Sequence, residues 1–372
     1  MKVGIPREVK NREYRVAITP SGVHELVRHG HDVFVERSAG LGSSIADEDF
    51  VAAGAKVLDD ADEVWGAAEL VLKVKEPIAE EFGRMQPGQT LFSYLHLAAG
   101  RDCANALLDR QVTGIAYETV ENHDGSLPLL APMSEVAGRL APQVGAQALL
   151  RASGGRGILL GGVSGVYAGK VVVIGAGVSG MNAAAIALGM QAEVLLLDRN
   201  IERLRQADRI YQGHLQTVAS NTYEIERAVL DADLVIGAVL VAGAKAPMLV
   251  SNELVSRMKP GSVLVDISID QGGCFEDSRP TTHDDPTYPV HSSVFYCVAN
   301  MPGAVPHTST YALTNVTLPY VLGLADHGWR AALAADAGLA KGLNTWSGSV
   351  VHPSVADALG VQAVPVGTAL AS

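Results

Sequence analysis

The stretch that decides the fold is residues 170–180, which read KVVVIGAGVSG. It begins with a run of β-branched residues typical of a buried strand, and the glycine pattern GxGxxG follows at once. Gly175 permits a tight turn, Gly177 lets the backbone approach a pyrophosphate, and Gly180 allows close packing of the helix that we expect next. That helix would direct its first N–H groups at the phosphates. The stretch therefore predicts a Rossmann-type dinucleotide site.

Asp198 supports this interpretation. It directly follows the next apolar run, residues 194–197, and lies 18 residues beyond Gly180, close to the ~20 at which a Rossmann fold places the acid that binds the adenosine ribose. Its charge would repel the 2′-phosphate of NADP, which favours NAD. Arg199 and Arg203 lie nearby in the sequence and weaken that preference. The alternative is a glycine-rich turn followed by an ordinary aspartate at a strand end.

Apolar runs separated by helical patterns extend on both sides of this stretch. They lie at residues 3–5, 33–35, 70–72, 91–92 and 115–117 in the first part of the chain and at 194–197, 234–236, 263–267 and 294–297 in the second. A long helical pattern covers residues 134–151, and the chain beyond about residue 306 reads mainly helical. Since 372 residues suffice for two domains, the sequence predicts an α/β protein with two Rossmann-like domains, each a mostly parallel sheet flanked by helices.

Composition excludes several classes of function. The net charge of −12, without a basic stripe, argues against a nucleic-acid partner. The three cysteines form no CxxC pair and have no histidine at metal-ligand spacing, so we expect no disulfide scaffold, no metal site and a reducing cytoplasm. The N-terminus is charged at once, unlike a signal peptide. The most apolar window, residues 157–169, is shorter than the ~20 residues that span a bilayer, so we expect no membrane partner.

Polar residues at three strand ends are candidates for catalysis. A dehydrogenase that acts on a small acid needs a cation for the carboxylate, which suits Arg, and an acid–base group, which suits His. Lys75, His96 and Asp270 each follow an apolar run. In open α/β sheets the active site lies at the carboxyl ends of the strands, where these residues are expected. From position alone, a solvated lysine and a structural histidine remain alternatives.

Longer motifs add a resemblance to a known family. They lie at residues 4–8 (GIPRE), 15–20 (RVAITP) with the nearby Asn11 and Glu13, 73–77 (KVKEP), 94–98 (YLHLA), 132–138 (PMSEVAG), 265–273 and 298–302 (VANMP). With these motifs the sequence resembles the alanine dehydrogenase and pyridine nucleotide transhydrogenase family over nearly the whole chain. The resemblance implies an active site in the cleft between the two domains. It also implies NAD-dependent interconversion of L-alanine with pyruvate and ammonium.

The resemblance assigns roles to individual residues. Arg15 would bind the substrate carboxylate and Lys75 would hydrogen-bond the substrate. His96 would be the acid–base group, and Asp270 would help to hold ammonia or activate water near the nicotinamide. Beside Gly175, Gly177 and Gly180, the implied NAD-binding residues are Ser134, Val178, Asp198, Arg203, Ser220, Val239, Leu240, Ile267, Asp270, Arg279, Val298 and Met301.

The resemblance further implies a discontinuous substrate domain. Residues 1–128 and 307–372 would form it, and residues 129–306 would form the NAD-binding domain. It also implies that identical chains assemble into a hexamer. The alternative within the family is the soluble NAD(H)-binding subunit of a proton-translocating transhydrogenase, which typically carries an Arg and a Gln before the long helix, where residues 130–135 read LAPMSE. A non-enzymic, NAD-sensing protein is the third possibility.

The chain departs from the family pattern at four positions. Arg12 stands where Asn is usual, Ser179 replaces Ala in the glycine loop, and Arg203 replaces Lys. Gln191 replaces a Gly before the strand that leads to Asp198, so we expect it to adopt a left-handed backbone conformation at a cost of ~1 kcal/mol. None of these departures removes a proposed catalytic group.

Overall fold

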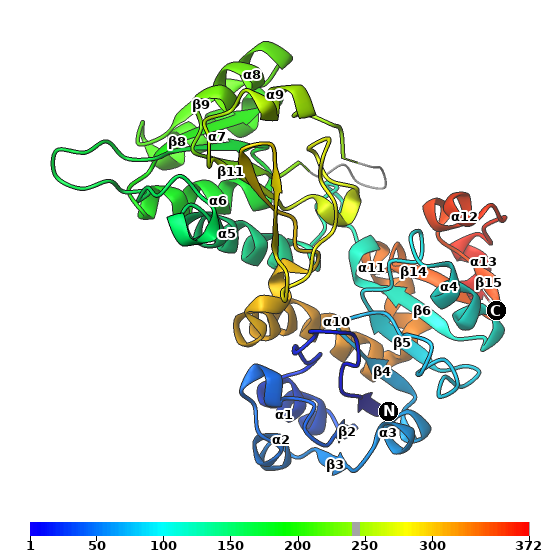
Figure 1. The fold of residues 1–372 in the computed structure, drawn as a ribbon. Coiled ribbons are helices and arrows are strands. Elements are labelled where there is room, and N and C mark those ends of the chain that lie inside the picture. The colour runs from blue at the N-terminus through cyan, green and yellow to red at the C-terminus, as the bar shows by residue number, and fades with distance from the viewer. Residues whose placement is uncertain (240–245, 372) are drawn as a thin grey trace. The chain divides into compact units, whose positions relative to one another are not determined.

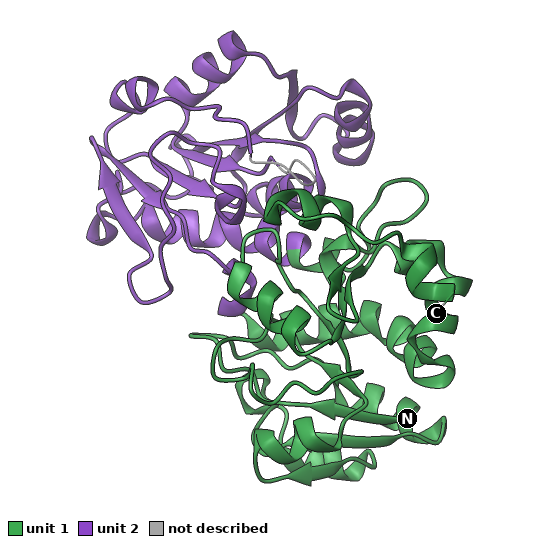
Figure 2. Cartoon of the chain, turned by 90° about the vertical axis from the view of Figure 1, so that its right-hand side faces the viewer, with its two compact units in different colours: residues 1–133, 305–372 green, residues 134–304 purple. Residues whose placement is uncertain are grey.

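The computed structural model describes residues 1–239 and 246–371 (Figure 1). These residues form two compact units, one from Met1–Met133 with Val305–Ser372 and one from Ser134–Ala304 (Figure 2). Leu240, one of the predicted NAD-binding residues, lies outside the described residues. Within the described part of the chain, no helix is long and apolar enough to cross a membrane. The assignment of substrate to the first unit and NAD to the second remains a prediction.

The first unit is built on an eight-stranded sheet in the order β15-β14-β6-β5-β4-β1-β2-β3. Its strands are β1 (Lys2–Ile5), β2 (Asp32–Glu36), β3 (Lys56–Leu58), β4 (Leu70–Leu72), β5 (Thr90–Ser93), β6 (Thr113–Ala116), β14 (Leu343–Trp346) and β15 (Ser349–Val350). The first six strands pair in parallel, while β14 runs antiparallel to both β6 and β15. The parallel strands end at one edge of the sheet, which carries the motifs expected to bind substrate.

Helices and short turns complete the first unit. They are α1 (Pro20–Arg28), η1 (Leu41–Ser43), α2 (Asp47–Ala52), α3 (Ala61–Ala67), α4 (Arg101–Asp109), η2 (Tyr117–Thr119), α10 (Pro306–Ala335), α11 (Ala337–Ala340), α12 (Pro353–Leu359) and α13 (Val366–Ala371). Buried residues of α3, α4 and α12 form one core cluster with Val71 and Leu91 of the sheet. Burial of such apolar faces is the main favourable contribution to folding.

The second unit has a seven-stranded sheet in the order β12-β13-β11-β10-β7-β8-β9. Its elements are α5 (Ala131–Ala148, which begins before the unit boundary), η3 (Arg151–Ser153), β7 (Lys170–Ile174), α6 (Val178–Gly189), β8 (Glu193–Asp198), α7 (Ile201–Tyr211), β9 (Gln216–Ala219), α8 (Thr222–Asp231), β10 (Leu234–Gly237), α9 (Asn252–Ser256), β11 (Val263–Asp266), η4 (Ile269–Gln271), β12 (Thr287–Val290), β13 (Ser293–Tyr296) and η5 (Met301–Ala304). Among the strands described for this sheet, β12 alone runs antiparallel to its neighbour.

Helices cover both faces of this second sheet. Val171 and Val173 of β7 belong to the core cluster that includes buried residues of α5, α6 and α7. Val172 and Ile174 belong to the cluster that includes residues of α8 and α9. This alternation follows from the two-residue period of a strand, and it explains why β7 is apolar throughout. The predicted fold class, two mostly parallel sheets flanked by helices, is confirmed.

The segment after residue 306 is mainly helical, as expected, with α10, α11, α12 and α13. It also contains two strands that were not expected, because β14 and β15 pair there and β14 extends the first sheet beside β6. Both strands are short, and Leu343, Asn344 and Thr345 are buried although only one of them is apolar. The period-two alternation that reveals a half-buried strand is therefore missing from this segment.

Candidate active site

The glycine turn after β7 has the geometry that the sequence predicts. Gly175 has φ +108°, which L side chains rarely adopt. A Cβ atom on Gly180 would lie 1.6 Å from the carbonyl oxygen of Gly175, so only glycine fits where α6 packs on the turn. A Cβ on Gly177 would meet nothing closer than Nη1 of Arg203, at 3.9 Å. The space above Gly177 and the first N–H groups of α6 fit a pyrophosphate group.

Asp198, at the end of β8, lies against this turn. Its Oδ2 accepts a hydrogen bond from the N–H of Ala176 at 2.6 Å, and its Oδ1 accepts one from the N–H of Asn200 at 2.7 Å. Nη1 of Arg203, on α7, lies 3.7 Å from Oδ2. The acid expected to bind the ribose is thus adjacent to the turn expected to bind the phosphates, with a cation beside both.

The other predicted nucleotide residues follow the carboxyl ends of strands in the same sheet. Ser220 follows β9 and donates its N–H to the carbonyl oxygen of Asp198 at 2.9 Å. Val239 follows β10 and Ile267 follows β11, and both are half-buried. Val298 follows β13. Because parallel strands end at one edge, the structure brings these positions to the same edge as the glycine turn.

The remaining nucleotide candidates vary in exposure. Ser134 is half-buried on α5, and Val178 is exposed in the first turn of α6. The side chains of Val298 and Met301 are buried in the core, so only their backbone atoms can face a ligand. Arg279 is exposed, and its guanidinium lies over the ring of Tyr288 with 4.0 Å between Cζ and the ring centroid.

Asp270 lies on η4 just after β11 and is exposed to solvent. Its loop is tied down by Asp266, whose Oδ1 accepts the N–H of Ser268 at 2.9 Å and whose Oδ2 accepts the N–H of Cys274 at 2.8 Å. Burial raises the pKa of Asp266, although these hydrogen bonds oppose the shift. The hydroxyl of Ser268 donates to the carbonyl oxygen of Val239 at 2.7 Å. Asp266 therefore fixes the backbone that carries Asp270.

Arg15 is buried in the first unit, with only 2% of its surface exposed. Its Nε donates to Oε1 of Glu13 at 2.6 Å and its Nη2 donates to Oε2 at 2.5 Å, which is a two-pronged carboxylate pair. Nη1 lies 3.0 Å from the sulfur of Met133. Burial lowers the pKa of Arg15, but the charge of Glu13 outweighs burial and raises it overall. The Nε–Nη2 edge of the guanidinium thus faces Glu13, which fixes its plane.

Lys75 is half-buried and follows β4. The backbone around it is held by Glu8, whose Oε1 accepts the N–H of Val74 at 2.6 Å. Lys73, fully buried on the same segment, pairs with Glu8 at 3.1 Å and Glu81 at 2.9 Å. Burial raises the pKa of Glu8 and the charge of Lys73 opposes that rise. This buried cluster anchors the turn from which Lys75 projects.

His96 follows β5 and adopts a left-handed backbone conformation with φ +48°. The carboxylate of Glu118, on η2, accepts the N–H of His96 at 2.6 Å and that of Leu95 at 3.2 Å. Such a conformation is uncommon for residues other than glycine and costs of order 1–3 kcal/mol. The Glu118 carboxylate stabilises it by bonding two successive N–H groups. Strained residues held in this way cluster at functional sites.

The His96 ring is held as well. Its Nδ1 lies 3.1 Å from Oε2 of Glu76, and the other carboxylate oxygen of Glu76 pairs with Nζ of Lys10. The ring stacks on Tyr94 with a centroid distance of 5.9 Å. Burial raises the pKa of Glu76, but the hydrogen bonds and charges of His96 and Lys10 outweigh it and lower the pKa to about 2. Glu76 is therefore an ionised acceptor at neutral pH.

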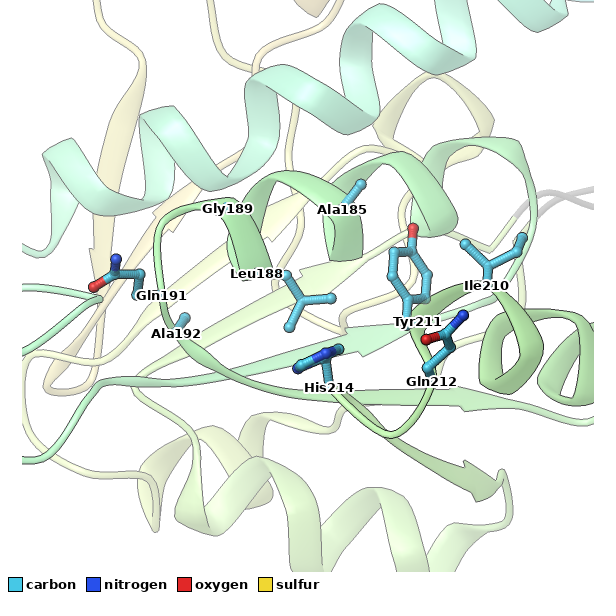
Figure 3. Close-up of a pocket in the computed structure, with 9 residues that line it drawn as sticks. All are labelled: Ala185, Leu188, Gly189, Gln191, Ala192, Ile210, Tyr211, Gln212 and His214. Atoms are coloured by element: carbon cyan, nitrogen blue, oxygen red, sulfur yellow. The ribbon is translucent and has the colours of Figure 1, made fainter.

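Figure 3 shows a pocket of about 630 Å³ elsewhere on the second unit. It is lined by residues near the C-terminal ends of α6 and α7, including Leu188, Tyr211 and His214, and by none of the predicted site residues. The pocket is thus at the opposite end of α6 from the glycine turn. Gln191, in its lining, has φ +63°, so the expected left-handed conformation is confirmed.

The sequence interpretation gave no role to the acids that hold the site. Glu13, Glu76 and Glu118 contact Arg15 or His96, and the first two lie inside motifs quoted for the resemblance. Glu76 could have been identified by position, because it follows Lys75 at the carboxyl end of a strand. Across residues 1–239 and 246–371, no group of three or more His, Cys, Asp or Glu side chains is arranged to hold a metal ion.

Comparison with known proteins gives consistent matches. Residues 4–137 match the family described as Alanine dehydrogenase/PNT, N-terminal domain, and residues 141–353 match Alanine dehydrogenase/PNT, C-terminal domain. The chain is 64% identical to the alanine dehydrogenase of Mycobacterium tuberculosis (strain ATCC 25618 / H37Rv) over 361 residues, 97% of each chain. It is 57% identical to that of Halomonas elongata over 364 residues, 98% of each chain.

Two solved structures are similar to nearly the whole chain. One L-alanine dehydrogenase structure superposes with a TM-score of 0.94 at 52% identity, over 97% of this chain and 99% of that one. A transhydrogenase from Sinorhizobium meliloti superposes with a TM-score of 0.80 at 26% identity, over 95% of this chain and 100% of that one.

Proposed function

The chain belongs to the alanine dehydrogenase/PNT family, and we propose that it catalyses the NAD-dependent oxidative deamination of L-alanine to pyruvate and ammonium, and the reverse reductive amination. The observation that carries this proposal is His96, which is held at the end of β5 by two carboxylates, one on its backbone and one on its ring. A hydride carrier alone needs no such group, whereas deamination moves protons on the substrate nitrogen and on water.

NAD would bind along the carboxyl edge of the seven-stranded sheet. The glycine turn and the first N–H groups of α6 would hold the pyrophosphate, and Asp198 would accept hydrogen bonds from the adenosine ribose. The nicotinamide supplies the redox chemistry by accepting a hydride from the substrate Cα. Arg279, aligned by Tyr288, adds a cation at this edge. The residues present therefore fit a dinucleotide.

The substrate carboxylate would be bound by Arg15 and Lys75. Because Nε and Nη2 of Arg15 face Glu13 and Nη1 lies 3.0 Å from the sulfur of Met133, the substrate carboxylate would take the place of Met133 beside Nη1. The pairing with Glu13 prevents rotation of the guanidinium, so its position is set before substrate arrives. Lys75 would add a second charge and hydrogen-bond the oxygen of pyruvate, polarising the carbonyl group. Two cations of this kind select a 2-oxo or 2-amino acid.

His96 would move the protons. During oxidation the amine form of the substrate loses a hydride from Cα to give an iminium ion, and water then adds to the iminium carbon. His96 would take a proton from that water and return one to the departing nitrogen. Asp270, on its fixed loop, would hold ammonium by charge or orient the water. In the reverse direction the same groups would act in the opposite order, with His96 donating to the carbonyl oxygen.

The assembly and location are part of the proposal. We infer a hexamer of identical chains on the family resemblance, which light scattering on the purified protein would test. The three cysteines, Cys103, Cys274 and Cys297, are unpaired as disulfides and buried, which suits a reducing cytoplasm.

One assay tests the reaction. NADH oxidation is followed with pyruvate plus ammonium, with pyruvate alone, and with an oxidised nucleotide analogue as hydride acceptor. The proposal requires oxidation that depends on both pyruvate and ammonium and that falls in the His96→Ala variant. Hydride exchange between two nucleotides, without any response to pyruvate and ammonium, would instead identify a transhydrogenase component and contradict the proposal.

A further inference from the structure

We propose that Glu76 and Lys10 are positioning residues that fix the tautomer and adjust the charge balance of His96. This inference rests on the proposed function, because it takes His96 as the acid–base group. Neither Glu76 nor Lys10 was given a role by the sequence motifs. Both act through His96 rather than on the substrate, and both belong to the first unit.

The three side chains form a line. Nζ of Lys10 pairs with Oε1 of Glu76, and Oε2 of Glu76 lies 3.1 Å from Nδ1 of His96. The Glu76 side chain is only 17% exposed, while those of Lys10 and His96 are 35% and 39% exposed. The carboxylate is thus the least exposed member, with one oxygen for each partner. An interaction held this way is screened less by solvent than a pair on the open surface.

The ionisation of Glu76 determines which ring nitrogen of His96 carries the hydrogen in the neutral state. Burial raises the pKa of Glu76, but the bonds to His96 and Lys10 lower it to about 2. Glu76 therefore carries no proton at neutral pH. A carboxylate only accepts hydrogen bonds, so Nδ1 of His96 must carry a hydrogen whether the ring is neutral or charged. The neutral ring then has its lone pair on Nε2. The proton that His96 exchanges in the reaction is therefore always the one on Nε2.

Lys10 moderates the effect of Glu76. A bare carboxylate beside the imidazole would favour the imidazolium strongly, and the ammonium of Lys10 offsets part of that negative charge. Groups near these three side chains, among the described residues, include Glu118, which is occupied by the N–H groups of Leu95 and His96, the Tyr94 ring, and Cys103 on α4. Burial, followed by the charge of Glu76, raises the pKa of Cys103 to about 12, so this thiol adds no charge.

Opposite substitutions should shift one pH profile in opposite directions. The quantity to compare is the midpoint of one limb in the pH profile of kcat/KM for alanine oxidation, namely the limb that is absent from the His96→Ala variant. Glu76→Gln removes the negative charge beside the imidazolium, so the midpoint of that limb should move to lower pH. Lys10→Gln leaves the carboxylate unopposed, so the midpoint should move to higher pH. Glu76→Gln should also lower kcat at least about tenfold, because a carboxamide can donate to Nδ1 and allow the wrong tautomer.

A second readout needs no cofactor. Diethyl pyrocarbonate reacts with neutral imidazole, so its rate of modification of His96 against pH, measured by mass spectrometry of the peptide in the protein alone, reports the same titration. Asp32→Asn is the matched control, because it removes an ion-paired carboxylate of the same unit whose partner is Lys56. Both profiles of this control should coincide with those of the unmodified protein.

The outcomes separate two failures. If Glu76→Gln and Lys10→Gln are folded and bind NADH normally but leave both midpoints in place, the two residues act structurally and the proposal is overturned. If Glu76→Gln does not fold, Lys10→Gln and Glu76→Asp decide: Lys10→Gln must raise the midpoint, and the shorter carboxylate must retain a midpoint close to the original. If the unmodified protein oxidises no alanine, or His96→Ala keeps the limb, then the proposed function fails instead.

Discussion

Asp198 accepts a hydrogen bond from the N–H of Ala176 at 2.6 Å, so the acid at the end of β8 holds the glycine turn that follows β7. Its other oxygen accepts the N–H of Asn200 at the start of α7. One carboxylate thereby connects the segments expected to bind the phosphates and the ribose. Removing it should disturb the turn as well as the choice of nucleotide, and an experiment must separate the two effects.

Asp198→Ala should improve the ratio of NADP to NAD use at least tenfold, equivalent to about 1.4 kcal/mol. The substitution removes repulsion of the 2′-phosphate and leaves Arg203, 3.7 Å from the lost carboxylate, to attract it. Loss of the bond to Ala176 should lower kcat/KM for both nucleotides, which is why the ratio is measured. Asp208→Ala, on the exposed part of α7, is the control. An unchanged ratio would contradict the assignment of Asp198.

Arg15→Lys should raise the KM for pyruvate at least about tenfold and leave the Kd for NADH nearly unchanged. Lysine keeps the charge but lacks the planar fork of arginine. It therefore cannot form the two-pronged pair with Glu13 and bind the substrate carboxylate at the same time. NADH fluorescence titration and pyruvate kinetics give the two quantities. Arg37→Lys, in an exposed pair with Asp59, serves for comparison. Equal losses in both quantities would show that Arg15 acts only in folding.

Local features of the site were predictable from the sequence, and contacts made by packing were not. The glycine turn and Asp198 are close in sequence and obey a fixed pattern, so their juxtaposition follows from one βαβ unit. The contact between His96 and Glu76 joins the ends of two neighbouring strands, and that of Arg15 with Met133 joins segments 118 residues apart. Neither has a spacing that a pattern encodes. The pairing of β14 with β6 was missed for the same reason.

Gln191 illustrates a backbone requirement that the sequence did reveal. It takes φ +63° just after α6, where glycine suffers no Cβ clash. Gln191→Gly should raise the free energy of unfolding by about 1 kcal/mol without a change in kcat. Urea denaturation measures the first quantity. Gln216→Gly, in strand β9, should instead lower stability, since glycine there only adds unfolded-state entropy. Lower stability for both variants would contradict the expectation.

Glu76 should make stability depend on pH. Its pKa falls from 4.5 to about 2 in the folded protein, so the carboxylate stabilises the fold fully above pH 4.5 and loses that contribution as the pH falls toward 2. Glu76→Gln should therefore be less stable than the unmodified protein by about 1–3 kcal/mol at pH 7, with a smaller difference at pH 3. Urea unfolding at both pH values measures this. A difference that stays constant would show that Glu76 is not ionised preferentially in the folded state.

His96→Ala should lower kcat by roughly 10²–10⁴, the usual contribution of general acid–base catalysis. The groups that would bind substrate and nucleotide remain, so the Kd for NADH should barely change. The limb of kcat/KM that depends on a group near neutrality should disappear. Because the residue takes φ +48°, alanine at this position keeps the backbone strain that glycine lacks, so His96→Gly serves as a second variant in which the ring is removed without that strain.

A purely structural role for His96 predicts a different combination of stability and rate in the His96→Ala variant. The variant would then melt earlier, and its folded fraction would keep most of the original rate. Measuring the melting temperature, the Kd for NADH and kcat on one preparation separates the two cases. If His96→Ala is folded, binds NADH and retains more than about a tenth of the original kcat, then the acid–base role is wrong, and the strained backbone between Glu118 and Glu76 would need another explanation.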